Sequence, residues 1–353
     1  EIGNTVMGYE AGKSIRHDAS DYNVIMGYQS CVGGTGARTQ SIAIGYRAWG
    51  NGGSANNVGG SENVFIGAES GGGTWATGAS DGNTAIGWNT MKGAMNGAAN
   101  NVAVGKSALA AITTGYSNVV IGQGAADVVT TMANTVVIGK DAMGACPAGQ
   151  AIDGAIAIGT GALTGSGSTT SAIGACVAVG ADSLKSLVSG AENVAIGFQT
   201  GEDLTTGSYN TILGHVAAKD MVTGLRNIAI GKQALGRATG DGSTAAHDNI
   251  SIGFQSMYGN FGAAAVHDCV AIGSGTMEGT TTAAASGAVA IGKSALGALT
   301  SGAGNTAIGY SSMSAQTDGE HNTVIGFSAF DAADSGESNN VVIGSGAAGA
   351  MNT

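Results

Sequence analysis

Apolar residues recur along this chain in a short phrase that ends in glycine, as in NVAIG at residues 193–197. The residues one and three positions before the glycine are bulky, as are Ile196 and Val194, and the residue between them is most often alanine. β-Branched residues that alternate at a period of two are typical of β-strands. The phrase therefore predicts a short β-strand directly before each glycine.

The phrase occurs nineteen times and tiles the whole chain. Its glycines are Gly8, Gly27, Gly45, Gly67, Gly87, Gly105, Gly122, Gly139, Gly159, Gly180, Gly197, Gly214, Gly231, Gly253, Gly273, Gly292, Gly309, Gly326 and Gly344. Neighbouring glycines are 17 to 22 residues apart, so each unit has one loop of adjustable length. Because so short a unit cannot bury its apolar face alone, neighbouring units must stack as coils about 4.8 Å apart. We expect an all-β fold, a parallel β-solenoid of about nineteen coils that forms a single repeat domain over residues 1–353.

Two further columns of the repeat carry structural information. Asn stands four residues before the glycine in thirteen copies, including Asn118 and Asn210, and predicts a ladder of stacked amides. The third residue after the glycine is Ala, Ser or Thr in every copy, and the fourth is Leu or Met in ten, as in Ala108 and Leu109. This segment predicts a second short strand, with a small residue beside a core residue.

The strand before the glycine is apolar on both of its faces. We expect the bulky residues, such as Ile196, to point into the coil and the small residues between them to point outward. Small outward residues would let the backbones of several chains approach closely, which favours a homo-oligomer, most simply a trimer. The alternative is a monomer whose alanine face is covered by its own loops.

Composition narrows the class of protein and of partner. The chain has 64 glycines, one proline and 10% charged residues, where globular chains have about 25% charged residues. A net charge of −11 argues against binding to nucleic acid or to an anionic membrane surface. No run of about 18 apolar residues predicts a membrane span, and no signal segment opens the chain. Since the repeat is already in progress at Asn4, we expect a processed chain or a fragment of a longer fibre.

The phrases NTAIG (83–87 and 305–309) and AVAIGKSALGA (288–298) resemble the head repeats of YadA-type trimeric autotransporter adhesins. They also resemble the related repeats of bacteriophage tail fibres. The resemblance implies a left-handed parallel β-roll of three chains, located outside the cell on a virion appendage or a cell surface. The longer and more variable unit is more similar to a phage or virus fibre shaft. Since residues 1–353 include no segment that resembles an autotransporter stalk or a fibre chaperone, both families stay open.

The leading functional hypothesis is a structural and adhesive fibre segment that presents loops to a host cell-surface glycan or protein. We expect no enzymatic activity and no cofactor. A polysaccharide-degrading tailspike is the first competitor, but it would need paired carboxylates at a controlled separation. An ice-binding solenoid is the second, and it would need a flat exposed array of threonines, whereas threonine here falls in five copies of a column expected to be buried.

One constellation of ionisable residues stands out. His247-Asp248 and His267-Asp268 occupy the same offset before Gly253 and Gly273, so stacking would place the two pairs in neighbouring coils about 5 Å apart. They are the weak candidate for a metal or acid–base site, and a solvated loop edge is the alternative. We expect the four cysteines, Cys31, Cys146, Cys176 and Cys269, to be unpaired within the chain.

Aromatic residues directly follow the glycine in eight copies, including Tyr9 and Tyr28, in a column that other copies fill with polar residues. This column predicts a partly exposed face, either a platform for sugar rings or an aromatic ladder that shields the strands. Tryptophan is confined to coils three to five. We expect Trp49 to be buried, and Trp75 and Trp88 are the candidate ligand-binding residues, since exposed indoles offer a flat stacking surface. The alternative is that Trp75 caps a loop against its own coil.

Overall fold

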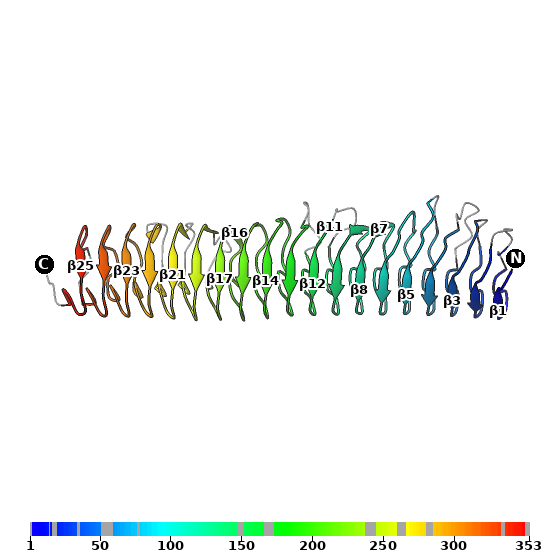
Figure 1. The fold of residues 1–353 in the computed structure, drawn as a ribbon, viewed down its shortest axis with the longest axis horizontal. Coiled ribbons are helices and arrows are strands. Elements are labelled where there is room, and N and C mark those ends of the chain that lie inside the picture. Colours follow the sequence, from blue (N-terminus) through cyan, green and yellow to red (C-terminus); the bar gives the residue numbers. More distant parts are fainter. Residues whose placement is uncertain are drawn as a thin grey trace. The chain divides into compact units, whose positions relative to one another are not determined.

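The computed structural model describes residues 2–13, 15, 20–33, 36–50, 59–75, 78–146, 152–165, 173–236, 245–259, 266–279, 285–332 and 336–349. These residues form β-strands and turns, and none of them lies in an α-helix. The chain divides into two compact units, Glu1–Cys176 and Val177–Thr353, and each unit is a parallel β-solenoid (Figure 1). The predicted all-β solenoid is thus confirmed, while the single domain over residues 1–353 stays a prediction.

The first unit stacks one strand from each repeat. These strands are β1 (Thr5–Met7), β2 (Val24–Met26), β3 (Ile42–Ile44), β4 (Val64–Ile66), β5 (Thr84–Ile86), β6 (Val102–Val104), β8 (Val119–Ile121), β10 (Val136–Ile138) and β12 (Ile156–Ile158). Each pairs with the next in parallel and in register, so Thr84 lies beside Val102 and Ile86 beside Val104. Equivalent residues of the repeat therefore form straight columns.

The second unit is built in the same way. Its stacked strands are β13 (Val177–Val179), β14 (Val194–Ile196), β15 (Thr211–Leu213), β17 (Ile228–Ile230), β19 (Ile250–Ile252), β21 (Val270–Ile272), β22 (Val289–Ile291), β23 (Thr306–Ile308), β24 (Thr323–Ile325) and β25 (Val341–Ile343). Here too the register is direct, with Ala195 beside Ile212 and Ile196 beside Leu213. In both units we call these strands the main strands.

Each unit also carries a small lateral sheet a few residues before the main strands. In the first unit it consists of β7 (Thr114–Tyr116), β9 (Thr131–Ala133) and β11 (Ile152–Asp153), paired in parallel. In the second it consists of β16 (Thr223–Leu225), β18 (Ala245–His247) and β20 (Val266–His267). A residue of positive φ, such as Ser117 at 58°, turns the chain from the lateral strand to the main strand.

The glycine that ends each phrase has a structural cause. These glycines have φ between 126° and 149°, a region that residues with a Cβ rarely adopt. At Gly197 an added Cβ would lie 2.3 Å from the carbonyl oxygen of Gly214 in the next coil. Positive φ and close backbone approach together explain why no other residue stands in this column.

The prediction of a second strand after the glycine is wrong, because this segment consists of turns. Ser107 and Leu109 have φ of 57° and 53°, which a strand does not permit, and Ala108 N donates to Gly105 O at 3.3 Å. Coils still bond one another here, as Leu109 N donates to Ala125 O at 2.9 Å. The alternation of a small and a large residue comes from the turn, which places Leu109 in the core with 0% exposure.

The expected orientation of the main strands is also wrong. Ala195 is 0% exposed and Ile196 is 41% exposed, so the small residue points inward and the bulky residues point outward. The reason is volume, because the Leu and Met side chains of the turn already fill the coil. Where the turn has glycine instead, the strand supplies a larger residue: a Cβ on Gly71 would lie 2.6 Å from Phe65 Cδ1. In the same way, a Cβ on Gly201 would lie 3.2 Å from Ile212 Cδ1.

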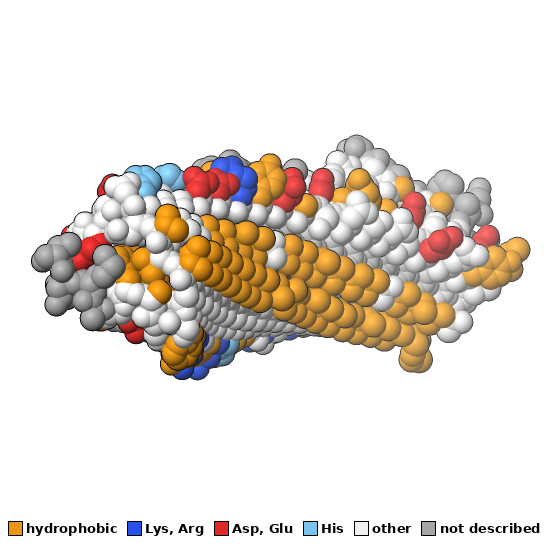
Figure 2. All heavy atoms as spheres, turned by 60° about the vertical axis from the view of Figure 1, so that its left-hand side comes forward, with side chains coloured by type: hydrophobic (Ala, Val, Ile, Leu, Met, Phe, Trp, Pro, Cys, Tyr) orange, Lys and Arg blue, Asp and Glu red, His pale blue; other side chains and the backbone are white. Residues whose placement is uncertain are grey.

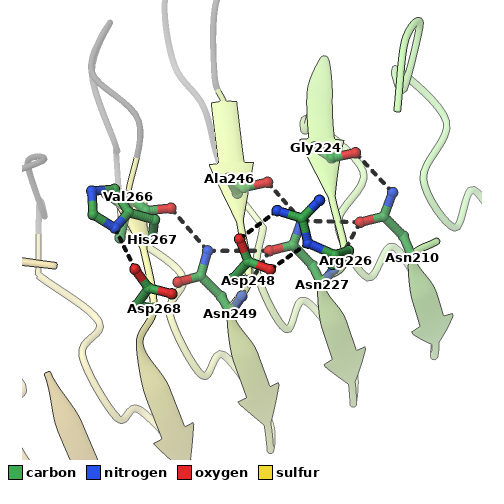
Figure 3. Close-up of polar contacts among 10 residues, drawn as sticks. All are labelled: Asn210, Gly224, Arg226, Asn227, Ala246, Asp248, Asn249, Val266, His267 and Asp268. Carbon is green, nitrogen blue, oxygen red and sulfur yellow. Dashed lines mark hydrogen bonds and ion pairs between the residues drawn. The ribbon is translucent and has the colours of Figure 1, made fainter. Parts of the chain in front are cut away.

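The Asn ladder is confirmed (Figure 3). Asn210 donates from N and Nδ2 to Asn193 Oδ1 at 3.1 and 2.9 Å, and Asn227 donates to Asn210 Oδ1 in the same way, both at 3.0 Å. Asn210 Nδ2 also donates to Gly224 O at 2.9 Å, which ties the main strand to the lateral strand. These Asn side chains are buried, so the ladder satisfies polar groups that water does not reach.

Candidate functional site

The outward residues of the main strands form an exposed apolar surface, the aliphatic face, on each unit. It consists of the residues one and three positions before each phrase glycine, and no charged residue stands in either column. Ile121 is 39% exposed in the first unit and Ile325 is 38% exposed in the second. Figure 2 shows these hydrophobic side chains gathered in rows over the strands. Contiguous apolar surfaces of this kind mark contacts with other molecules.

The aromatic column forms a stacked, exposed ladder. Tyr28 stacks on Tyr9 and on Tyr46, with ring centroids 5.3 and 5.6 Å apart, and Tyr310 stacks on Phe327 at 5.2 Å. Both faces of Tyr28 are thus covered by its neighbours. Such rings present their edges to solvent, so this geometry favours the shielding ladder over a platform for sugar rings.

The two tryptophans that are candidates for ligand binding differ in their exposure to solvent. Trp75 is only 1% exposed, with its Nε1 donating to Gly71 O at 3.1 Å and its ring 5.6 Å from Trp49 and 5.8 Å from Phe65. Trp75 is therefore not an exposed ligand-binding indole, and the alternative that it packs against its own coil agrees with the structure, because the side chain fills the space that Gly71 leaves. Trp88 is exposed as expected, and Lys106 Nζ lies 4.8 Å above its ring. Trp49 is buried, as predicted.

The two His-Asp pairs lie in neighbouring coils, as predicted, with His247 in register with His267. Their carboxylates have different partners (Figure 3). Asp248 accepts from Arg226 at 2.6 and 2.8 Å, and this contact lowers the pKa of its carboxyl group. Asp268 Oδ2 lies 2.8 Å from Nδ1 of His267. Within the described ranges no group of three or more His, Cys, Asp and Glu side chains is placed to hold a metal ion.

The four cysteines are buried, and none of them forms a disulfide with another described cysteine. Burial raises the pKa of the Cys146 thiol to about 12, and it also raises the pKa of Cys269. Cys31 contacts Arg38, whose Nη1 lies 3.4 Å from its Sγ, and burial raises its pKa as well. Such thiols are poor nucleophiles, since the thiolate is the reactive form.

Sequence reasoning missed one feature, an open groove over the lateral sheet of the first unit. It is lined by Asn96, Gly97, Thr114, Gly115, Tyr116, Thr131, Met132, Ala133 and Asp153. By its composition alone, the segment TTGYS at 113–117 is typical of a polar loop. A sequence signal for a strand at this position is the recurrence of the Thr-Gly pair in the second unit. There Thr223 and Gly224 are followed by Leu225, whereas in the first unit the pair is followed by a tyrosine.

Comparison with known proteins gives no further guide. No protein-family model matches the sequence, and a search of curated proteins finds no match. Among the residues that the structure describes, no helix is long and apolar enough to cross a membrane.

Proposed function

We propose that this chain is a structural and adhesive segment of an extracellular fibre, in which three copies pack around one axis through their aliphatic faces. In this proposal the fibre is a left-handed solenoid of about nineteen coils that acts as a rigid shaft without enzymatic activity. A phage or virus fibre shaft is the favoured assignment because the repeat length varies from 17 to 22 residues. A bacterial trimeric autotransporter head, or a cell-surface filament, is the alternative.

The observation that carries the proposal is the exposure of the aliphatic face. Bulky, mostly β-branched side chains repeat once per coil in two straight columns, so the surface is regular and uncharged along its length. A second copy of the chain offers the same spacing and the same chemistry, and it matches such a surface coil by coil. Since most homo-oligomers close with point-group symmetry, a cyclic assembly would cover the face of every copy.

The test is the mass of the undenatured protein. Multi-angle light scattering should give three times the chain mass of 34.0 kDa. Replacing Ile196 and Ile230, which point outward from β14 and β17, by serine should shift the protein towards lower mass at low concentration. A monomer at every concentration would overturn the proposal. A dimer or tetramer that the serine variants weaken would overturn the trimer but would support the aliphatic face as the interface.

A further inference from the structure

The groove over the lateral sheet of the first unit has the dimensions of a small binding site. It is open to solvent and has a volume of about 330 Å³. This volume is at the lower end of the range for ligand sites, roughly 300–1,000 Å³. Alternation along β7 directs Gly115 inward and Thr114 and Tyr116 outward, into the groove.

One row of residues across the sheet defines the shape of the groove. Tyr116, Ala133 and Asp153 are register partners on β7, β9 and β11. Adjacent strands are about 4.8 Å apart, so the outer two residues stand roughly 9.6 Å apart at the backbone. Because the middle residue is only alanine, the row has an aromatic wall, a carboxylate wall and a low floor.

The polar atoms of the groove are arranged for hydrogen bonding. Tyr116 is 54% exposed, so its ring is accessible. Asp153 Oδ1 accepts from Ala133 N at 3.0 Å, which fixes the carboxylate, and within the described part of the chain Oδ2 makes no hydrogen bond. Thr114 is exposed and Thr131 is half-buried, and both contribute hydroxyls to the lining.

The second unit shows what the same sheet looks like without the groove. Its corresponding row is Leu225, His247 and His267, which are register partners on β16, β18 and β20. A histidine thus takes the place of Ala133, and a leucine takes the place of Tyr116. The aromatic wall, the low floor and the carboxylate are therefore features of the first unit alone among the two lateral sheets described.

We propose that the groove binds a neutral hexopyranose unit of a glycan. The apolar face of a sugar ring would pack on Tyr116, and its hydroxyls would donate to Asp153 in charge-assisted hydrogen bonds and bond with Thr114 and Thr131. No Lys or Arg lines the groove, and the net charge of −11 disfavours sulfated and acidic glycans. The biological role of this glycan binding rests on the proposed adhesive function. Sugar binding and assembly of the trimer are measured in separate experiments.

The experiment uses the full chain, with methyl glycosides of glucose, galactose and mannose and a glycan array as probes. Tyr116→Leu introduces the residue that the second unit has at this place, and Ala133→His fills the floor in the same way. Asp153→Asn keeps the shape of the side chain and removes its charge. Tyr209→Leu is the matched control, since Tyr209 is 56% exposed and lies outside the groove.

The parent should bind at least one neutral hexopyranoside, detected by saturation-transfer NMR. Tyr116→Leu and Ala133→His should each weaken that binding by at least about tenfold, and Tyr209→Leu should not change it. Binding that survives Tyr116→Leu, an absence of binding by the parent at millimolar sugar, or a preference for amines such as choline would overturn the inference. Light scattering on the same samples reports assembly, so a failure of the trimer is seen independently of a failure of the groove.

Discussion

Ala195 and Ile196 are consecutive residues of β14, yet Ala195 is fully buried and Ile196 is 41% exposed. Ala195→Asp would place an unpaired charge in a filled coil, so we expect it to lower the free energy of unfolding by more than about 4 kcal/mol. Ile196→Asp should cost the single chain about 1 kcal/mol or less and instead weaken self-association. Thermal melting followed by circular dichroism, together with light scattering, separates the two effects. Equal melting of both variants would show that the assigned orientation is wrong.

The phrase glycine offers a second matched pair. Gly197 and Gly287 both have positive φ, at 140° and 76°, but a Cβ at Gly197 would lie 2.3 Å from Gly214 O, whereas one at Gly287 has nothing within 4 Å. Gly287→Ala should cost about 1–2 kcal/mol from the backbone conformation alone. Gly197→Ala should cost several kcal/mol more, because two coils must move apart. Chemical denaturation of both variants measures the difference, and similar midpoints would contradict the close contact.

The Asn ladder is expected to make a large contribution to stability. Asn210→Ala leaves Gly224 O and the donors of Asn227 without their partner in a buried site. Each unsatisfied buried group costs about 1–3 kcal/mol, so the total loss should exceed about 3 kcal/mol.

Serine is the control at this position. The chain itself has Ser41 in the Asn column, where Ser41 Oγ accepts from Asn63 N at 3.1 Å. Asn210→Ser should therefore be less harmful than Asn210→Ala. If urea denaturation places the two variants at the same midpoint, the hydrogen bonds are not the source of the stability.

The two tryptophans should respond differently to truncation. Trp75→Ala empties a buried aromatic cluster with Trp49 and Phe65 and should cost about 3–5 kcal/mol. Trp88→Ala removes an exposed ring and should change the melting temperature little. Fluorescence supports the assignment, because Trp88 should be the indole quenched by iodide in the native protein. Loss of attachment to host cells in Trp88→Ala with unchanged melting would point to this indole as a contact residue.

Burial of Cys146 predicts a loss of stability at high pH. Its thiol pKa rises from 9.0 to about 12 on folding, so below pH 9 both states keep the proton. Above that value the unfolded state loses its proton first, and stability falls as the pH rises towards 12, by on the order of 2–4 kcal/mol. Cys146→Ala removes this contribution, so the parent and the variant should converge in stability from pH 9 to 11. Parallel pH curves would contradict the prediction.

Much of the fold follows from the sequence because the same residue types recur at the same positions of each repeat. A glycine in every copy of one column aligns the repeats, and the recurrent Asn predicts the ladder that links Asn193, Asn210 and Asn227. Strand position and parallel stacking follow from these two columns and the apolar residues between them.

The orientation of the strand did not follow, because periodicity alone does not say which of two apolar faces is buried. That choice depends on the volume left by the turn, as Gly71 and Phe65 show, and so on a contact between two columns. The groove, too, could not be predicted from periodicity within one repeat. Tyr116, Ala133 and Asp153 lie in three different repeats with unequal loops, so only the register of β7, β9 and β11 brings them into one row.

The Asn ladder also gives each solenoid unit an electrical direction. In every link described, the amide nitrogen of the later coil donates to the amide oxygen of the earlier coil, as in Asn101 to Asn83 and Asn322 to Asn305. The side-chain dipoles therefore add head to tail, with the positive end towards the earlier coils, and each amide polarises the next. The two ends of a solenoid unit therefore differ in electrostatic potential. As a consequence, parallel and antiparallel packing of two chains differ in electrostatic energy.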